Sequence, residues 1–183
     1  MHRTAPPRRS RASRARGFTL IEAAIATMIV GSGIVAVMGA QRAFHVQNEW
    51  AAEAATAQQL GTEVRELVLG LPQRDPVTND DAWGPEGDED GVGDFDDLDD
   101  FDGAVFDSAD GTGPLNALRL PIAGMDGWRQ RVLVENIDPF DLTSTVADGA
   151  SELMRVTVIV ERRAPAEESP REFTRVSWIA PRR

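Results

Sequence analysis

Carboxylates are the side chains of this chain whose number and spacing could do chemistry. Fifteen Asp and Glu residues fall between Asp75 and Asp110, a stretch that holds no basic residue. Carboxylate oxygens are the ligands that calcium prefers, and one frame here has the spacing of a twelve-residue calcium loop. The sequence therefore indicates calcium as a candidate ligand and no other cofactor. The acids at positions 1, 3, 5, 9 and 12 of the frame are Glu86, Asp88, Asp90, Asp94 and Asp97, with Gly91 at position 6.

This frame departs from a standard calcium loop in three ways. Glu86 replaces an Asp at position 1, Asp97 replaces a bidentate Glu at position 12, and Pro85 opposes an entering helix. Residues 88–94 resemble a short calcium repeat of the thrombospondin type 3 kind, but the repeat occurs once, whereas such repeats form arrays. We therefore interpret the stretch first as a solvated acidic loop without a bound metal, with a calcium site as the alternative.

A single carboxylate also lies inside the longest apolar run. Residues 18–40 contain one charged side chain, Glu22, and as a helix they would reach about 34 Å, enough to cross the hydrocarbon layer of a membrane. A carboxylate costs about 2.5–3.5 kcal/mol at the centre of a membrane helix, and it is retained when it has a partner. Cleavage before Phe18 would create an α-amine at the membrane face. In a staggered packing of helices, Glu22 of one subunit could neutralise the amine of its neighbour, so we interpret Glu22 as an assembly residue.

The charges on either side of the apolar run set its expected orientation. Residues 1–17 hold six Arg and no acid, whereas the chain from Phe18 onward holds thirteen Arg against thirty acids. A basic segment before an apolar run stays in the cytoplasm, so we expect a single-pass inner-membrane protein with a periplasmic C-terminal region. A chain this acidic is not expected to bind nucleic acid, because phosphate binding needs a basic surface.

The junction of the basic and apolar segments carries a specific motif. Residues 16–22 read RGFTLIE, and this sequence resembles the processing signal of type IV prepilins and type II secretion pseudopilins. The resemblance implies that prepilin peptidase cuts between Gly17 and Phe18 and methylates the new Phe18 amine, and that Glu22 acts in subunit docking. It also implies other pilin or pseudopilin subunits and an inner-membrane assembly platform as partners, within a pilus or pseudopilus. An ordinary signal peptide is the alternative, although it has no use for Glu22.

Composition and periodicity divide the chain into five segments. We expect a cleaved leader over 1–17, a membrane helix over 18–40, an amphipathic continuation of that helix over 41–71, an acidic loop over 72–114 and an antiparallel sheet region over 115–183. The predicted fold class is α+β and pilin-like, with the long N-terminal helix packed on a small antiparallel sheet. The helical continuation has apolar positions at Val46, Trp50, Ala54, Ala57, Leu60, Val64, Leu67 and Leu71, and the strands are expected at Asn116–Ile122, Arg129–Ile137, Leu153–Glu161 and Glu172–Ile179.

The acidic stretch carries a second resemblance. Residues 94–103 read DFDDLDDFDG, which is similar to a motif in minor pilins of the mannose-sensitive haemagglutinin class. Phe95, Leu98 and Phe101 recur every third residue in it, a spacing that would also pack the loop onto the domain. The similarity favours a structural minor pilin over a minor pseudopilin of a type II secretion system. A membrane-anchored calcium-binding envelope domain is a further alternative.

An enzyme is not expected. The chain has no Cys, no G-x-S-x-G motif, no Walker loop and no zinc-ligand spacing. Of its two histidines, His2 lies in the leader, and His45 follows the apolar run without a neighbouring Asp or Ser constellation. The expected function is therefore structural.

Overall fold

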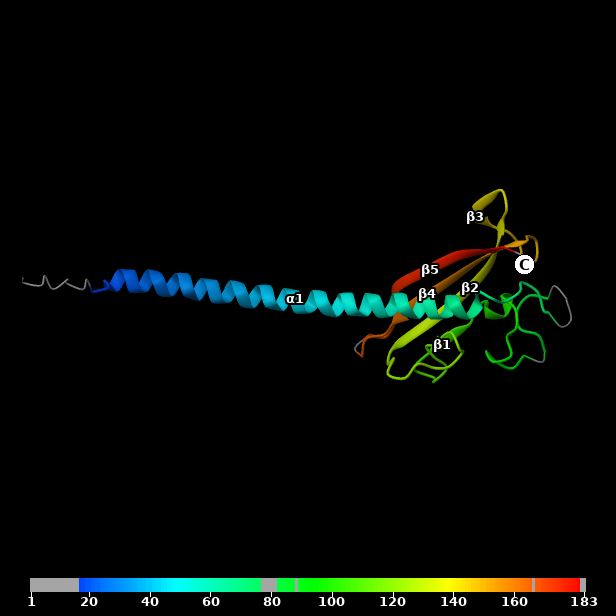
Figure 1. Cartoon of the computed structure of the whole chain (residues 1–183), viewed down its shortest axis with the longest axis horizontal. Helices are drawn as coiled ribbons and strands as arrows, with labels where there is room; N and C mark the ends of the chain where they lie inside the picture. Colours follow the sequence, from blue (N-terminus) through cyan, green and yellow to red (C-terminus); the bar gives the residue numbers. More distant parts are fainter. Residues whose placement is uncertain (1–16, 77–81, 88, 166, 182–183) are drawn as a thin grey trace, which may run out of the picture. The chain divides into compact units, whose positions relative to one another are not determined.

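The computed structural model describes residues 17–76, 82–87, 89–165 and 167–181 (Figure 1). The expected leader, apart from Gly17, lies outside these residues. Contacts divide the chain into two compact units, an N-terminal unit (residues 1–48) and a C-terminal unit (residues 49–183). One helix, α1 (Leu20–Val68), contributes residues to both. The two units are described separately below.

Helix α1 is continuous because nothing in its sequence interrupts it. No Pro falls between Leu20 and Val68, and Ala is the commonest residue there. The helix ends where Gly70 and Pro72 cannot continue it. In the N-terminal unit every described residue is exposed. In the C-terminal unit one stripe is buried, at the spacing of a single helix face: Ala57, Leu60, Gly61, Val64, Leu67 and Val68.

The C-terminal unit contains a five-stranded antiparallel sheet. Its strands are β1 (Val105–Asp107), β2 (Trp128–Asp138), β3 (Asp141–Thr145), β4 (Leu153–Arg162) and β5 (Arg171–Pro181), and a short 3-10 helix, η1 (Asp99–Phe101), precedes them. The order is β1-β2-β4-β5, with β3 pairing the end of β2 opposite to β1. A long N-terminal apolar helix with an antiparallel sheet is the α+β arrangement expected from the sequence, and that expectation is confirmed.

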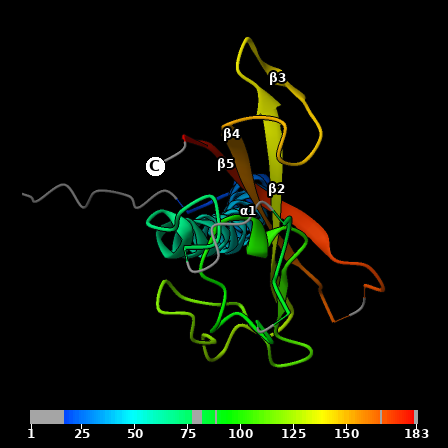
Figure 2. The same ribbon diagram turned by 90° about the vertical axis from the view of Figure 1, so that its right-hand side faces the viewer.

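The core lies between α1 and one face of this sheet. Alternate residues of β2 and β4 point to it, and the register places Val132 opposite Val158 and Val134 opposite Val156. All four are at most 3% exposed. Figure 2 shows α1 end-on beside these strands. The period-two alternation of Val in the sequence therefore produces the face on which the helix packs.

One buried polar side chain joins α1, β2 and the loop at Leu115, which precedes β2. Gln130 on β2 is completely buried, and its Nε2 donates to the backbone oxygens of Leu60 (2.8 Å) and Leu115 (3.0 Å). Its Oε1 accepts the backbone N–H of Leu115 at 2.7 Å. A buried amide is tolerated here because both of its ends are hydrogen-bonded.

The expected strand over Asn116–Ile122 is wrong. This segment contains a single bridge, between Leu115 and Pro121, around a tight turn. The Asn116 Oδ1 accepts the N–H groups of Leu118 and Leu120, and Arg119 adopts a φ of 63°. Side-chain hydrogen bonds from Asn compete with a strand ladder, which explains the turn. Strands β2, β4 and β5 lie where strands were expected, whereas β1 and β3 were not anticipated.

Candidate functional site

Gly17 and Phe18, the expected cleavage point, precede α1. Both lie outside regular structure, and Phe18 is 77% exposed. The helix begins directly after Thr19, whose Oγ1 accepts the backbone N–H of Glu22 at 3.3 Å. Thr19 therefore caps the helix, in the Thr-x-x-Glu pattern typical of helix starts. The peptide bond between Gly17 and Phe18 is accessible, and the helix that follows it is fixed by its own cap.

Glu22 lies in the first turn of α1 and is exposed. A negative side chain here is favoured by the partial positive charge of the helix N-terminus. No hydrogen bond or ion pair with another described residue engages its carboxylate. The helix dipole therefore accounts locally for a negative side chain at this position. The carboxylate oxygens of Glu22 remain available to a group from another chain.

The apolar surface of the N-terminal unit lies on both sides of Glu22 and extends along α1. An 18-residue window of α1 is long and apolar enough to cross a membrane, and none of it is buried within the protein. Apolar side chains point to all sides of the helix, which is the pattern of a helix surrounded by lipid or by other helices. The exposed large apolar residues between Leu20 and Met38 are Leu20, Ile21, Ile25, Met28, Ile29, Val30, Ile34, Val35, Val37 and Met38.

The acidic loop is held to the sheet by its aromatic and apolar residues. Leu98 and Phe101 are 3% and 0% exposed and belong to the core. Phe101 makes edge-on ring contacts with Phe95 (5.2 Å between centroids) and with Phe106 of β1 (6.5 Å). Asp102 follows, and its Oδ1 accepts the N–H of Val134 on β2 at 2.9 Å. The spacing of three that suggested packing in the sequence does bury Leu98 and Phe101.

Burying these apolar residues also buries the acids between them. Asp97, Asp99 and Asp100 are at most 3% exposed. The Asp97 Oδ1 accepts the N–H groups of Asp99 and Asp100, and the Asp100 Oδ2 accepts those of Asp96 and Asp97. The loop thus satisfies several of its backbone donors with its own carboxylates.

The pKa values of these acids report how poorly the charges are tolerated. Burial, followed by the charge of Asp99, raises the pKa of Asp97 from 3.8 to about 7. Burial also raises the pKa of Asp100 to about 7, despite the hydrogen bond from the backbone of Asp97. The pKa of Glu86 reaches about 7 as well, through desolvation and through a shared hydrogen bond with Glu89. The described cations and hydrogen-bond donors around these acids do not offset the burial and mutual repulsion of their negative charges.

The structure gathers a different set of carboxylates from the frame expected in the sequence. Oxygens of Glu86, Glu89 and Asp100 lie within 4.8 Å of one another, and we call these three residues the acidic triad. Of the five acids in the calcium-loop frame expected from the sequence, Glu86 belongs to the triad. Asp97 does not, and its Oδ1 accepts backbone N–H groups. Asp90 and Asp94 are exposed, and Asp88 lies outside the described residues.

Sequence reasoning missed Glu89 and Asp100. Glu86 and Glu89 are three residues apart, and a turn joins them: the Glu89 N–H donates to the Glu86 oxygen at 3.0 Å. The spacing Glu-x-x-Glu was a visible signal for that pair. Asp100 comes from η1, and only the folding of the loop over Phe101 brings it to the pair.

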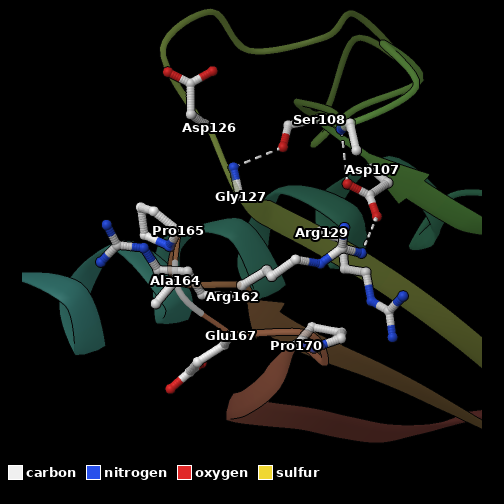
Figure 3. A pocket seen from close by; sticks show the side chains of 12 residues that line it. Asp107, Ser108, Asp126, Gly127, Arg129, Arg162, Ala164, Pro165, Glu167 and Pro170 are labelled. Carbon is white, nitrogen blue, oxygen red and sulfur yellow. Dashed lines mark hydrogen bonds and ion pairs between the residues drawn. The ribbon is translucent and has the colours of Figure 1, made fainter.

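A cavity of about 400 Å³ lies elsewhere in the C-terminal unit, beside the starts of β2 and β5 (Figure 3). Three arginines line it, and each already has a carboxylate partner. Arg129 bonds Glu161 at 2.6 Å, Arg162 bonds Glu53, and Arg163 lies 3.9 Å from Asp107. With its cations paired to the protein's own acids, this cavity is a weaker candidate than the acidic triad.

Comparisons with known proteins add no family to these observations. No protein-family model, no curated protein and no solved structure matches this chain.

Proposed function

We propose that this chain is a structural subunit of a type IV pilin-like filament, processed after Gly17 and assembled through helix α1. The observation that carries the proposal is the junction at residues 16–22. An accessible Gly17–Phe18 bond and the Thr19 cap immediately precede α1, and the exposed Glu22 lies in its first turn. The 18-residue apolar window of this helix is not buried within the described protein. A helix of this kind needs either lipid or other helices around it.

The proposed mechanism uses both environments in turn. Before assembly, α1 crosses the inner membrane, with the basic leader in the cytoplasm and the C-terminal unit in the periplasm. Removal of the leader creates an α-amine on Phe18. In the filament, the Glu22 carboxylate of one subunit pairs with this amine on its neighbour, and the apolar surfaces of adjacent helices cover one another. The same helix thus serves as membrane anchor and as filament core.

Small residues support close helix packing within such a filament. Ala23, Thr27 and Gly31 share one stripe of α1 at a spacing of four, and an added β-carbon at Gly31 would have nothing within 4 Å. Lipid tails are as apolar as the side chains, so the hydrophobic effect does not drive helices together within a membrane. Stripes of small residues let the helix backbones approach closely and associate through van der Waals contacts instead. The Thr27 hydroxyl donates to the Ala23 oxygen at 2.7 Å, so the stripe presents no unsatisfied hydroxyl.

Among filament systems, we propose a minor pilin. The DFDDLDDFDG stretch, which resembles that of minor pilins, forms the buried turn around Phe101 and sits against β2. A pseudopilin of a type II secretion system would use the same anchor and processing. Genes for pilus or for secretion machinery beside the gene for this chain would separate the two.

Replacement of Glu22 tests the assembly step. We expect Glu22→Gln to be processed and to remain in the membrane, but to enter sheared filaments at least about tenfold less than the unaltered chain. Glu49→Gln is the matched control, because Glu49 is also an exposed acid on α1. It should enter filaments normally. Normal incorporation of Glu22→Gln would contradict the proposal.

A further inference from the structure

The acidic triad brings three carboxylates from two parts of the loop to one point. Glu86 and Glu89 come from a turn, in which the Glu86 N–H also donates to the Glu89 Oε2 at 3.1 Å. Asp100 comes from η1. An oxygen of each lies within 4.8 Å of the other two. The loop is therefore closed on itself at a point where three negative groups meet.

The spacing of the oxygens suits a cation that binds several carboxylates. One oxygen of each of the three side chains lies within 4.8 Å of the other two. Calcium binds oxygens at about 2.3–2.6 Å in flexible geometry, so three oxygens spread around one ion lie up to about 4.5 Å apart, and the triad reaches that spacing with at most a small side-chain movement. Magnesium usually takes one or two protein carboxylates and keeps several waters, so three converging carboxylates favour calcium.

An orphaned oxygen provides an independent sign that a ligand belongs at the triad. Asp100 is 1% exposed, and its Oδ2 is already engaged by the N–H groups of Asp96 and Asp97. Its other oxygen, Oδ1, is fully buried and has no hydrogen-bond partner in the described structure. Buried oxygens of this kind are rare in folded proteins, and a bound ion is one of the groups that satisfies them. This carboxylate is also the one that meets Glu86 and Glu89.

The charges around the triad call for a cation. Burial raises the pKa values of Glu86 and Asp100 most, and the side chains that raise them further are acidic: Glu89 and Asp100 act on Glu86, and Asp97 and Glu89 act on Asp100. The guanidinium of Arg119, which stacks near Phe101, donates instead to the backbone oxygens of residues 92 and 93. Buried carboxylates are stable when they are paired or when they coordinate a metal.

We propose that Glu86, Glu89 and Asp100 bind one calcium ion, which joins Glu86 and Glu89 to η1. Glu86 and Glu89 are half-buried, so water can complete a shell of six to eight oxygens. The ion would join the start of the acidic loop to the segment that Phe101 and Asp102 hold against the sheet. This inference does not rest on the filament proposal, and either can fail without the other.

Calorimetry of the full-length chain in detergent micelles, stripped of metal and titrated with calcium chloride, tests the site. We expect one calcium ion per chain and a higher thermal unfolding temperature when calcium is present. The double variant Glu86→Gln with Glu89→Gln should bind calcium at least about tenfold more weakly. Each Gln keeps an acceptor oxygen for the turn, and an unchanged circular dichroism spectrum would show that this variant folds.

A second pair of variants separates the triad from the rest of the acidic loop. Asp90→Asn with Asp94→Asn removes two charges from exposed residues outside the triad, and its calcium affinity should stay within about twofold of the original. Asp100→Asn, which keeps an acceptor for the backbone of Asp96 and Asp97, should weaken binding as the glutamate variant does. No heat with the unaltered chain, or equal affinity for it and for the glutamate variant, would overturn the proposal.

Discussion

Gly61 of α1 lies directly against Val176 of β5. A β-carbon added at Gly61 would stand 2.6 Å from the Val176 Cγ2 and 3.7 Å from the Val160 Cγ2 on β4. The helix can approach the sheet this closely because Gly61 has no side chain. Within the C-terminal unit, this contact fixes how deeply the buried stripe of α1 sits over the strands.

Gly61→Ala should therefore destabilise the C-terminal unit. Val176 is β-branched and cannot easily rotate away, so overpacking is expected to cost about 1–3 kcal/mol, reduced by the roughly 1 kcal/mol that Ala gains over Gly in a helix. Gly70→Ala is the control, since an added β-carbon there meets nothing within 4 Å. Urea unfolding followed by tryptophan fluorescence measures both. A gain of about 1 kcal/mol for Gly61→Ala, as expected for an unhindered Gly-to-Ala change in a helix, would show that the helix is not held at this distance.

Gln130→Leu tests the polar fastening between α1 and β2. The substitution leaves the buried N–H of Leu115 without its acceptor and removes both donors to the Leu60 and Leu115 oxygens. An unsatisfied buried group costs about 1–3 kcal/mol, and the variant should lose at least that much unfolding free energy. Gln59→Leu, on the exposed side of α1, should change stability by less than about 0.5 kcal/mol. A stable Gln130→Leu variant would refute this role.

Phe101→Ala tests whether the acidic loop is part of the core. Phe101 is completely buried, and truncation of such a side chain costs about 3–5 kcal/mol. Phe140, at the turn between β2 and β3, is 99% exposed and provides the matched control. We expect thermal unfolding to shift strongly for Phe101→Ala and hardly at all for Phe140→Ala. Similar shifts for the two variants would mean that the loop does not contribute to the core.

The buried acids predict an unusual pH dependence for the metal-free chain. The pKa values of Asp97 and Asp100 are about 7 in the folded protein and 3.8 as unperturbed groups. The folded state therefore binds protons that the unfolded state releases, so the stability from these groups is complete below pH about 4 and declines as the pH rises to about 7. With a chelator present, the melting temperature should fall by about 5 °C or more between pH 5 and pH 7.5.

A variant identifies the acids responsible for that dependence. Asp100→Asn should flatten the change between pH 5 and pH 7.5, because the amide does not titrate. Asp110→Asn should leave it unaltered, since hydrogen bonds to Thr112 lower the pKa of exposed Asp110, and its effect falls below this range. A melting temperature that rises with pH in the chelated protein would have the wrong sign for this account.

The elements that could be predicted from the sequence are those with a regular pattern of apolar residues. The unbroken apolar and amphipathic run produced α1, and the Val alternation of residues 132–134 and 156–160 produced β2 and β4. β1 has three residues with only Phe106 buried, and every residue of β3 is exposed, so neither leaves a burial pattern to detect. At residues 116–122 the side-chain hydrogen bonds of Asn116 outweighed an apolar pattern that looked like a strand.

Of the two candidate sites, one could be recognised from the sequence and the other could not. Gly17, Phe18 and Glu22 belong to one short contiguous motif, so the order of the residues is enough to recognise it. The acidic triad joins a local pair to Asp100, whose position depends on the burial of Phe101. Spacing within the loop cannot specify that contact, because it is made by tertiary packing.

The mature N-terminus tests the central claim most directly. We would isolate the chain from cells that contain an active prepilin peptidase and determine its N-terminal peptide by mass spectrometry. The account predicts a chain that begins at Phe18 and carries a methyl group on its α-amine. A chain that retains residues 1–17, or that begins near Ala40, would contradict it.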